Sequence, residues 1–247
     1  MTGADHVRTG RANQDAFTWR RGERALVAVV CDGCGSGRHS EVGAKLGARL
    51  LTEAAVRLLD AGASAAEPAT WSRVRRDLLA QLRLVANAMG GSLTDTVADY
   101  FLFTVVGVAV TPDWTVVVAA GDGVIAVNGT ARQLGPFPGN QPPYLTYDLA
   151  SDQPGPPLAI EARVPTSQVR SILVGTDGAV DLPADQLSLD GLCTDDALFR
   201  NRDAVRRRLA LLAAERVTPD WEQRRLVRAR GRLPDDTTVI ALRRGAA

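Results

Sequence analysis

Lysine is almost absent from this chain: Lys45 is the only one among 29 basic residues, and the rest are arginines. The 28 acidic residues leave a net charge of +1. Such a balance creates no overall positive field to attract nucleic acid or an anionic membrane, so we expect neither as a partner. We interpret the arginines first as a compositional bias and second as a means of phosphate recognition.

The sequence also gives no indication of disulfide bonds or of long apolar segments. Three cysteines, an odd number, do not suggest a disulfide framework. No stretch approaches the roughly 18 consecutive apolar residues of a membrane span, and residues 1–6 lack the features of a signal peptide. We therefore expect a cytoplasmic protein. The 247 residues show no linker, so we expect a single domain over residues 1–247.

Short apolar runs and two helical periodicities define the expected elements. Runs rich in β-branched residues predict strands, and apolar residues recurring every three or four positions predict helices. The strands are expected over residues 16–20, 25–31, 100–110, 115–120, 124–128, 169–175 and within 233–242, and the helices over 40–60, 71–89, 204–215 and 221–228. Strands joined by hairpins, together with long paired helices, favour an α+β layered domain.

The segment from Gln133 to Pro157 is rich in proline and glycine. We expect a long exposed loop there. It could close over a site as a lid or dock a partner kinase, and the sequence leaves both open.

Five aspartates stand where apolar runs begin or end. Asp32, Asp122 and Asp177 each follow such a run, whereas Asp15 and Asp235 each precede one. In an antiparallel sheet the end of one strand lies beside the start of its neighbour, so all five can share one rim. Crowded carboxylates repel one another unless a cation neutralises them, which predicts a divalent-metal site. Two Mg²⁺ or Mn²⁺ ions about 3.5–4 Å apart can activate a shared water for phosphoester hydrolysis.

The order of these motifs resembles the metal-dependent protein phosphatases of the 2C type, in particular a bacterial branch of that family. The resemblance extends from about residue 5 to residue 242. It is carried by Asn13-Gln14-Asp15-Ala16-Phe17, Val29-Val30-Cys31-Asp32-Gly33-Cys34-Gly35-Ser36-Gly37, Gly121-Asp122-Gly123, Thr176-Asp177-Gly178-Ala179-Val180-Asp181 and Asp235-Asp236-Thr237-Thr238.

This resemblance implies a four-layer αββα sandwich, in which two antiparallel sheets are flanked by helices. It also implies that Asp32 bridges two Mg²⁺ or Mn²⁺ ions, with the Gly33 carbonyl on the second ion. Asp177 and Asp235 would complete the shell of the first ion. Asp122 and Asp181 match the positions that hold a third, weaker ion in bacterial members. Asp15 would orient the attacking water.

Three positions depart from the family pattern. Gln14 stands where many members have glutamate, which lowers the negative charge around the second ion. Gly10 stands where many members have a phosphate-clamping arginine, so Arg11 or Arg8 would have to take that role. Cys34 stands where some members carry a histidine proposed as general acid, and a thiol there could donate a proton, ligate a metal or oxidise.

The leading hypothesis is a phosphatase acting on phosphoserine and phosphothreonine in proteins, by direct attack of a metal-bound hydroxide. A regulatory or binding module with little activity is the second hypothesis, because of Gly10, Gln14 and Cys34. A metal-dependent hydrolase of small phosphoesters or nucleotides is the third. The pair Cys31 and Cys34 does not predict a zinc or redox site, because no second pair accompanies it.

Overall fold

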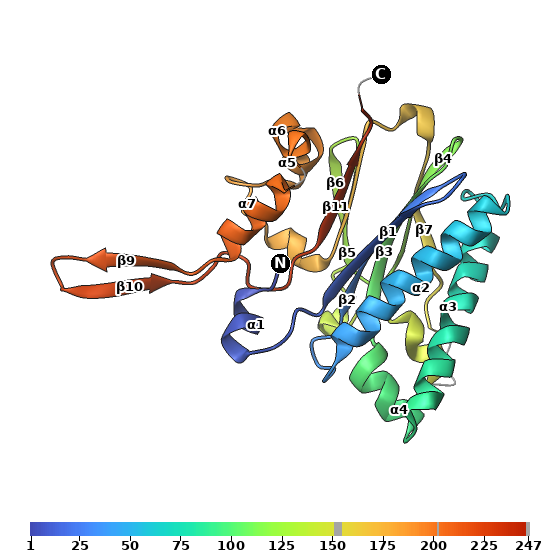
Figure 1. Ribbon diagram of the computed structural model, residues 1–247, viewed down its shortest axis with the longest axis horizontal. Helices are drawn as coiled ribbons and strands as arrows, with labels where there is room; N and C mark the ends of the chain where they lie inside the picture. Colours follow the sequence, from blue (N-terminus) through green and yellow to red (C-terminus); the bar gives the residue numbers. More distant parts are fainter. Residues whose placement is uncertain (151–154, 202, 246–247) are drawn as a thin grey trace.

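The computed structural model describes residues 1–150, 155–201 and 203–245 of the chain. Its layers are visible in Figure 1, where helices lie on both outer sides of two facing sheets. The α-helices are α1 (Ala4–Thr9), α2 (Ser40–Asp60), α3 (Pro68–Met89), α4 (Leu93–Thr96), α5 (Leu189–Thr194), α6 (Asp196–Arg200) and α7 (Ala204–Ala213).

The strands form two main antiparallel sheets and one separate hairpin. The five-stranded sheet has the order β1-β2-β3-β4-β7, the four-stranded sheet β11-β8-β5-β6, and β9 pairs only with β10. Their bounds are β1 (Asp15–Arg21), β2 (Leu26–Gly33), β3 (Phe103–Val110), β4 (Trp114–Ala120), β5 (Gly123–Val127), β6 (Thr130–Leu134), β7 (Ala159–Pro165), β8 (Ser171–Gly175), β9 (Arg216–Asp220), β10 (Arg225–Ala229) and β11 (Val239–Arg243).

Three apolar clusters separate the four layers. One joins the five-stranded sheet to α2 and α3, with Trp71 and Leu78 of α3 fully buried. A second fills the space between the sheets, with Val30 of β2 and Val174 of β8 among its members. The third packs α5 to α7 on the four-stranded sheet through side chains such as Leu192. This arrangement confirms the predicted αββα sandwich.

Strands β2, β3 and β4 are buried on both faces, because helices cover one face and the other sheet covers the second. That burial explains why they appear in the sequence as continuous apolar runs rather than as alternating ones. The antiparallel pairing of β1 with β2 places Asp15 opposite Asp32, at the end of that strand pair.

Two predictions about local structure were wrong. The helix expected over 221–228 is instead the turn and second strand of the β9–β10 hairpin. Its residues are all exposed, so no packed face supports a helix there, and Asp220 Oδ1 accepts a hydrogen bond from the Gln223 amide that fixes the turn.

The predicted exposed loop over 133–157 was also wrong in its central part. That part forms the 3-10 turns Pro138–Asn140 and Leu145–Leu149, and Tyr144, Leu145 and Leu149 are buried. Residues 151–154 of this segment lie outside the described residues. The segment is packed because its apolar side chains reach the core beneath α3.

Candidate active site

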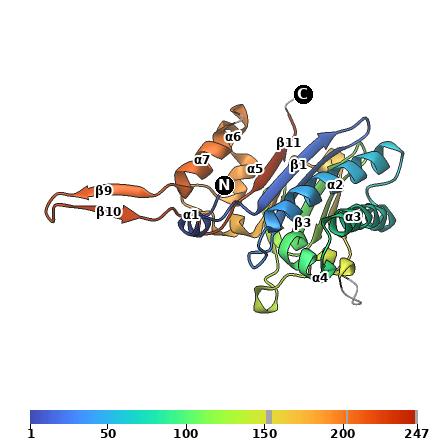
Figure 2. The same ribbon diagram turned by 60° about the horizontal axis from the view of Figure 1, so that its bottom comes forward.

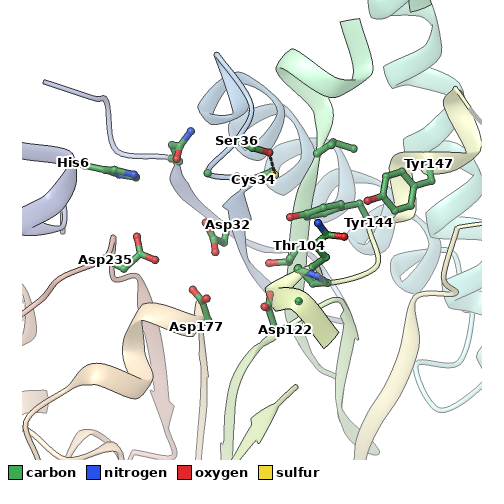
Figure 3. A pocket seen from close by; sticks show the side chains of 17 residues that line it. His6, Asp32, Cys34, Ser36, Thr104, Asp122, Tyr144, Tyr147, Asp177 and Asp235 are labelled. Carbon is green, nitrogen blue, oxygen red and sulfur yellow. Dashed lines mark hydrogen bonds between the residues drawn. The ribbon is translucent and has the colours of Figure 1, made fainter. Parts of the chain in front are cut away.

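One cavity of about 520 Å³ opens at the end of the sandwich where the predicted acids gather. Figure 3 shows Asp32, Asp177 and Asp235 facing one another across it, with Asp122 farther along the same floor. Asp32 lies at the end of β2, Asp122 in the β4–β5 turn and Asp177 in the turn after β8. Asp235 lies in the segment that leads into β11. The tertiary structure thus brings together residues up to 203 positions apart (from Asp32 to Asp235) in the sequence.

The opposite wall of the cavity is formed by less polar side chains. Cys34, Tyr144 and Tyr147 line it, with Ser36 beside Cys34. Tyr144 and Tyr147 meet edge to face, with ring centroids 5.6 Å apart. The sequence assigned neither tyrosine to the site, because their segment was expected to be an exposed loop.

Hydrogen bonds connect the segment that carries the aromatic wall to α3. Arg75 donates to Asp148 Oδ2 over 2.7 Å and to the carbonyl of Pro156 over 2.9 Å. Arg83 donates to the Asp148 carbonyl over 2.9 Å. Asp148 is one residue beyond Tyr147, so these contacts hold the wall in place beside the carboxylates.

Burial and mutual repulsion disturb the ionisation of the acids. Burial raises the pKa of Asp32 well above its usual range, and the charges of Asp15, Asp177 and Asp235 raise it further. Burial, with Asp177 nearby, raises the pKa of Asp122 to about 6. The site is therefore costly to ionise without a compensating positive charge.

Asp15 borders this set but does not line the cavity. It is 7% exposed, and Thr176 Oγ1 donates to its Oδ2 over 2.8 Å. Burial raises the pKa of Asp15 to about 7 despite that hydrogen bond. As the cross-strand partner of Asp32, it can influence the cavity through that residue.

The donor set fits hard divalent cations. The buried oxygens Asp177 Oδ1, Asp15 Oδ1 and Gln14 Oε1 accept no hydrogen bond within the described structure, although each is an acceptor that a cation could use. Asp and amide oxygens are the ligand types that Mg²⁺ and Mn²⁺ prefer. Across the described residues, however, no three acidic, histidine or cysteine side chains already converge as a finished metal site. The carboxylates would have to close on the ions as they bind.

Gly33 and Gln14 are the residues that the sequence assigned to a second ion. Both line the cavity, and the Gly33 amide donates to the Gln14 carbonyl over 3.1 Å. A Cβ on Gly33 would come within 2.8 Å of the Ser40 carbonyl, so only glycine lets α2 begin this close to the acids. Gln14 Nε2 donates to Ser40 Oγ over 2.6 Å, which leaves its Oε1 available.

The predicted phosphate-clamping arginines are not in the cavity. Arg8 lies 3.5 Å from Asp5 on the exposed side of α1. Arg11 donates to the Gly37 carbonyl over 3.2 Å, at the edge of the glycine-rich loop. Neither residue lines the cavity, whose described lining contains no arginine or lysine. Asp181 likewise does not line it; it is exposed at the far end of the turn that begins with Asp177.

Cys34 lies on the cavity wall with Sγ 3.1 Å from Ser36 Oγ. Burial alone would raise the pKa of this thiol, but hydrogen bonds from Ser36 and Tyr144 outweigh it and lower the pKa. A thiolate here would add to the negative charge of the cavity. Cys31, three residues earlier in β2, is fully buried in the core.

Asp236 is a structural residue that the sequence analysis did not single out. It is 2% exposed and accepts hydrogen bonds from the amides of Gly3 (2.8 Å) and Gln14 (2.6 Å). His6 Nδ1 lies 2.9 Å from its Oδ2, and His6 also lines the cavity. Asp236 thus ties three N-terminal positions to the segment that carries Asp235. Its place in the pair Asp235-Asp236 was the available signal.

The chain is a layered αββα sandwich of the α+β class. Acidic side chains cluster at one end of its sheets, and such a cluster is suited to binding cations. A family model described as "Protein phosphatase 2C" matches residues 2–225. The chain therefore belongs to the protein phosphatase 2C family. A search among curated proteins finds no match.

Solved structures of low sequence identity share this fold. A bacterial serine phosphatase bearing an R161E mutation is similar with a TM-score of 0.57 and 14% identity, over 98% of this chain and 94% of that one. The serine/threonine phosphatase Stp1 from Staphylococcus aureus has a TM-score of 0.55 and 14% identity, over 100% and 93%. The SiaA-PP2C domain of Pseudomonas aeruginosa has a TM-score of 0.50 and 15% identity, over 94% and 81%.

No helix among the described residues combines the length and the apolar composition needed to cross a membrane. The expected cytoplasmic location stays a prediction.

Proposed function

We propose that this chain is a Mg²⁺- or Mn²⁺-dependent phosphatase that hydrolyses phosphoserine and phosphothreonine in proteins. One observation carries the proposal: four carboxylates line a cavity whose described lining contains no arginine or lysine. A phosphate dianion would be repelled from such a cavity unless cations occupied it first. Membership of the phosphatase 2C family supports the same reaction.

Asp32, Asp177 and Asp235 are the residues that would hold two ions, together with the Gly33 carbonyl and Gln14 Oε1. Asp122 would contribute to a third ion; the exposed position of Asp181 gives that residue no comparable support. When bound, the ions supply a nucleophilic water at neutral pH and neutralise charge on the phosphoryl oxygens.

The protein's own residues then have distinct tasks. Asp32 and Asp177 orient the reacting groups from the floor of the cavity, and Asp15 positions Asp32 from the neighbouring strand. The Tyr144 and Tyr147 wall narrows the cavity on the opposite side and contacts the part of the substrate next to the phosphate. Cys34 lines the same space, and hydrogen bonds from Ser36 and Tyr144 lower the pKa of its thiol.

The test is phosphate release from a phosphothreonine peptide with Mn²⁺, compared with EDTA and with Asp32→Asn. We expect turnover only for the unaltered chain with Mn²⁺, and circular dichroism should show that the variant is folded. Equal turnover in all three samples would reject the proposal.

A second function, a phosphatase-like binding module of low activity, is favoured by the lack of a cavity arginine and by Gln14 in place of an acid. Titration calorimetry with Mn²⁺ separates the two functions. A module without catalysis should bind Mn²⁺ weakly or not at all while remaining folded. A partner kinase stays a prediction.

A further inference from the structure

The β9–β10 hairpin projects from the body of the molecule as an arm, as Figures 1 and 2 both show. In the described structure its two strands pair only with each other. Every residue of the arm from Arg216 to Ala229 is exposed except Asp220, which is partly so. A two-stranded ribbon without a covering layer is marginally stable in water, so its persistence needs an explanation.

The base of the arm is held firmly. The Arg232 amide donates to the Leu212 carbonyl of α7 over 2.7 Å, and the Arg232 guanidinium binds both oxygens of Asp185 over 3.0 and 3.2 Å. A Cβ on Gly231 would come within 2.2 Å of the Ala213 carbonyl, so the chain passes α7 as closely as glycine allows. Leu233, just after, is fully buried. The arm is therefore a built extension with a fixed direction.

Apolar side chains occupy positions on the arm where the body cannot cover them. Cross-strand pairing places Val217 opposite Arg228 and Pro219 opposite Leu226 on one face. Val217 is 45% exposed and Leu226 62%, and Trp221 at the turn is 82% exposed. Exposed tryptophan beside aliphatic residues is typical of surfaces that bind another polypeptide.

The charge of the arm indicates the chemistry of that partner. Residues 215–230 contain five arginines and three acids. Arg225 and Arg228 pair with Asp220 and Glu215 across the arm. Within the described chain, Arg216 and Arg224 have no acidic partner. The excess charge is positive, and Arg216 projects from the face of the arm opposite Val217, because successive side chains of a strand alternate between its two faces.

We propose that the β9–β10 arm docks an extended, acidic segment of a partner protein, with carboxylates against Arg216 and Arg224 and apolar side chains on Val217, Leu226 and Trp221. The unpaired outer edges of the strands allow such a segment to add as a further strand. A second copy of this chain is disfavoured, because it would set arginines against arginines. Nucleic acid is disfavoured, because Glu215, Asp220 and Glu222 are interspersed with the arginines.

The arm is also connected to the rim of the candidate active site. Arg230, at its base, lies 3.8 Å from Asp5 of α1. The same short helix carries His6, which lines the cavity. A protein docked on the arm would therefore lie on the side of the molecule from which α1 borders the site.

A binding assay tests the arm without relying on catalysis. The probe is a fluorescein-labelled peptide of twelve residues with alternating glutamate and leucine, added to the full chain in EDTA and followed by anisotropy. We expect saturable binding that weakens with salt, and peptides alternating lysine or serine with leucine should bind far less. Trp221→Ala and the double variant Arg216→Glu/Arg224→Glu should each weaken binding about tenfold or more.

Matched controls lie on the other side of the molecule. Arg73→Glu and Leu84→Ala change an exposed arginine and an exposed leucine of α3, and they should leave the affinity unchanged. The proposal is overturned if arm and α3 variants bind the acidic peptide equally, if the serine or lysine peptides bind as well, or if duplex DNA binds more tightly. Light scattering that shows an arm-dependent dimer would also overturn it. Because the assay contains no metal and needs no turnover, failure of the proposed phosphatase activity would leave its outcome unaffected.

Discussion

Replacing Asp15 by asparagine should make the metal-free protein more stable at pH 8. Asp15 is buried, and its pKa is raised from 3.8 to about 7 in the folded protein. Between these two values the folded state holds the proton that the unfolded state has released. The free energy of unfolding therefore falls as the pH rises from about 4 to about 7, and the loss is complete above that range.

The size of the effect follows from the size of the shift. Each pKa unit corresponds to about 1.4 kcal/mol, so a shift of roughly three units costs about 4 kcal/mol at pH 8. Asparagine keeps the shape and can still accept from Thr176 Oγ1, but it buries an amide donor near Asp236, which costs about 2 kcal/mol. The net gain is about 2 kcal/mol, or about 4–8 °C in Tm for a chain of this length.

The assay is thermal unfolding in EDTA at pH 5 and at pH 8 for both proteins. At pH 5 the cost in the unaltered chain is only about 1.6 kcal/mol, so the variant should gain nothing there. Saturating Mn²⁺ should remove the advantage at pH 8, because bound cations favour ionised carboxylates. A Tm change that is the same at both pH values, or a loss at pH 8 in EDTA, would refute the idea that burying the Asp15 carboxylate destabilises the metal-free protein.

Three further predictions concern the cavity and its supports. Tyr147→Ala should raise KM for a phosphothreonine peptide several-fold, whereas Tyr147→Phe should leave KM near normal, because the ring rather than the hydroxyl forms the wall. An equal rise in KM for p-nitrophenyl phosphate and for the peptide would contradict this prediction. Asp236→Ala should lower the free energy of unfolding by about 3 kcal/mol, because it leaves two buried amides without an acceptor. Urea denaturation measures this loss, and an unchanged midpoint would show that these hydrogen bonds contribute nothing to stability. Asp122→Ala should weaken one class of Mn²⁺ sites in calorimetry, whereas Asp181→Ala should not, and the reverse order would mean that the turn after Asp177 rearranges on binding.

The main sheets could be predicted because their sequences carry a strong signal. Strands such as β2 and β4 are buried on both faces, so nearly every residue in them is apolar. Helix α3 shows the corresponding periodicity, with Trp71, Val74, Leu78 and Leu82 buried on one face. Strand β7 was missed because its residues are mostly half-buried, and they carry no continuous apolar run.

The acids could be predicted for a related reason. Antiparallel pairing forces strand ends together, so aspartates at the ends of apolar runs converge whatever the loops between them do. The arginines could not be assigned in this way. Arg8 and Arg11 lie on or beside a short helix whose direction is set by the bonds of Asp236 to residues far away in the chain.

The sequence by itself determined the layered fold and the identity of the acids at its open end, because burial and strand pairing leave their marks residue by residue. Only the tertiary structure decided what faces those acids. Tyr144 and Tyr147 form the opposite wall because Arg75 and Arg83 of α3 hold Asp148, a contact across more than 60 residues that no local pattern encodes. The tertiary structure likewise decided that β9 and β10 form a projecting arm, whose base passes close to α7 at Gly231. A ribbon that packs against nothing leaves no periodicity in its sequence, so no sequence pattern predicts it.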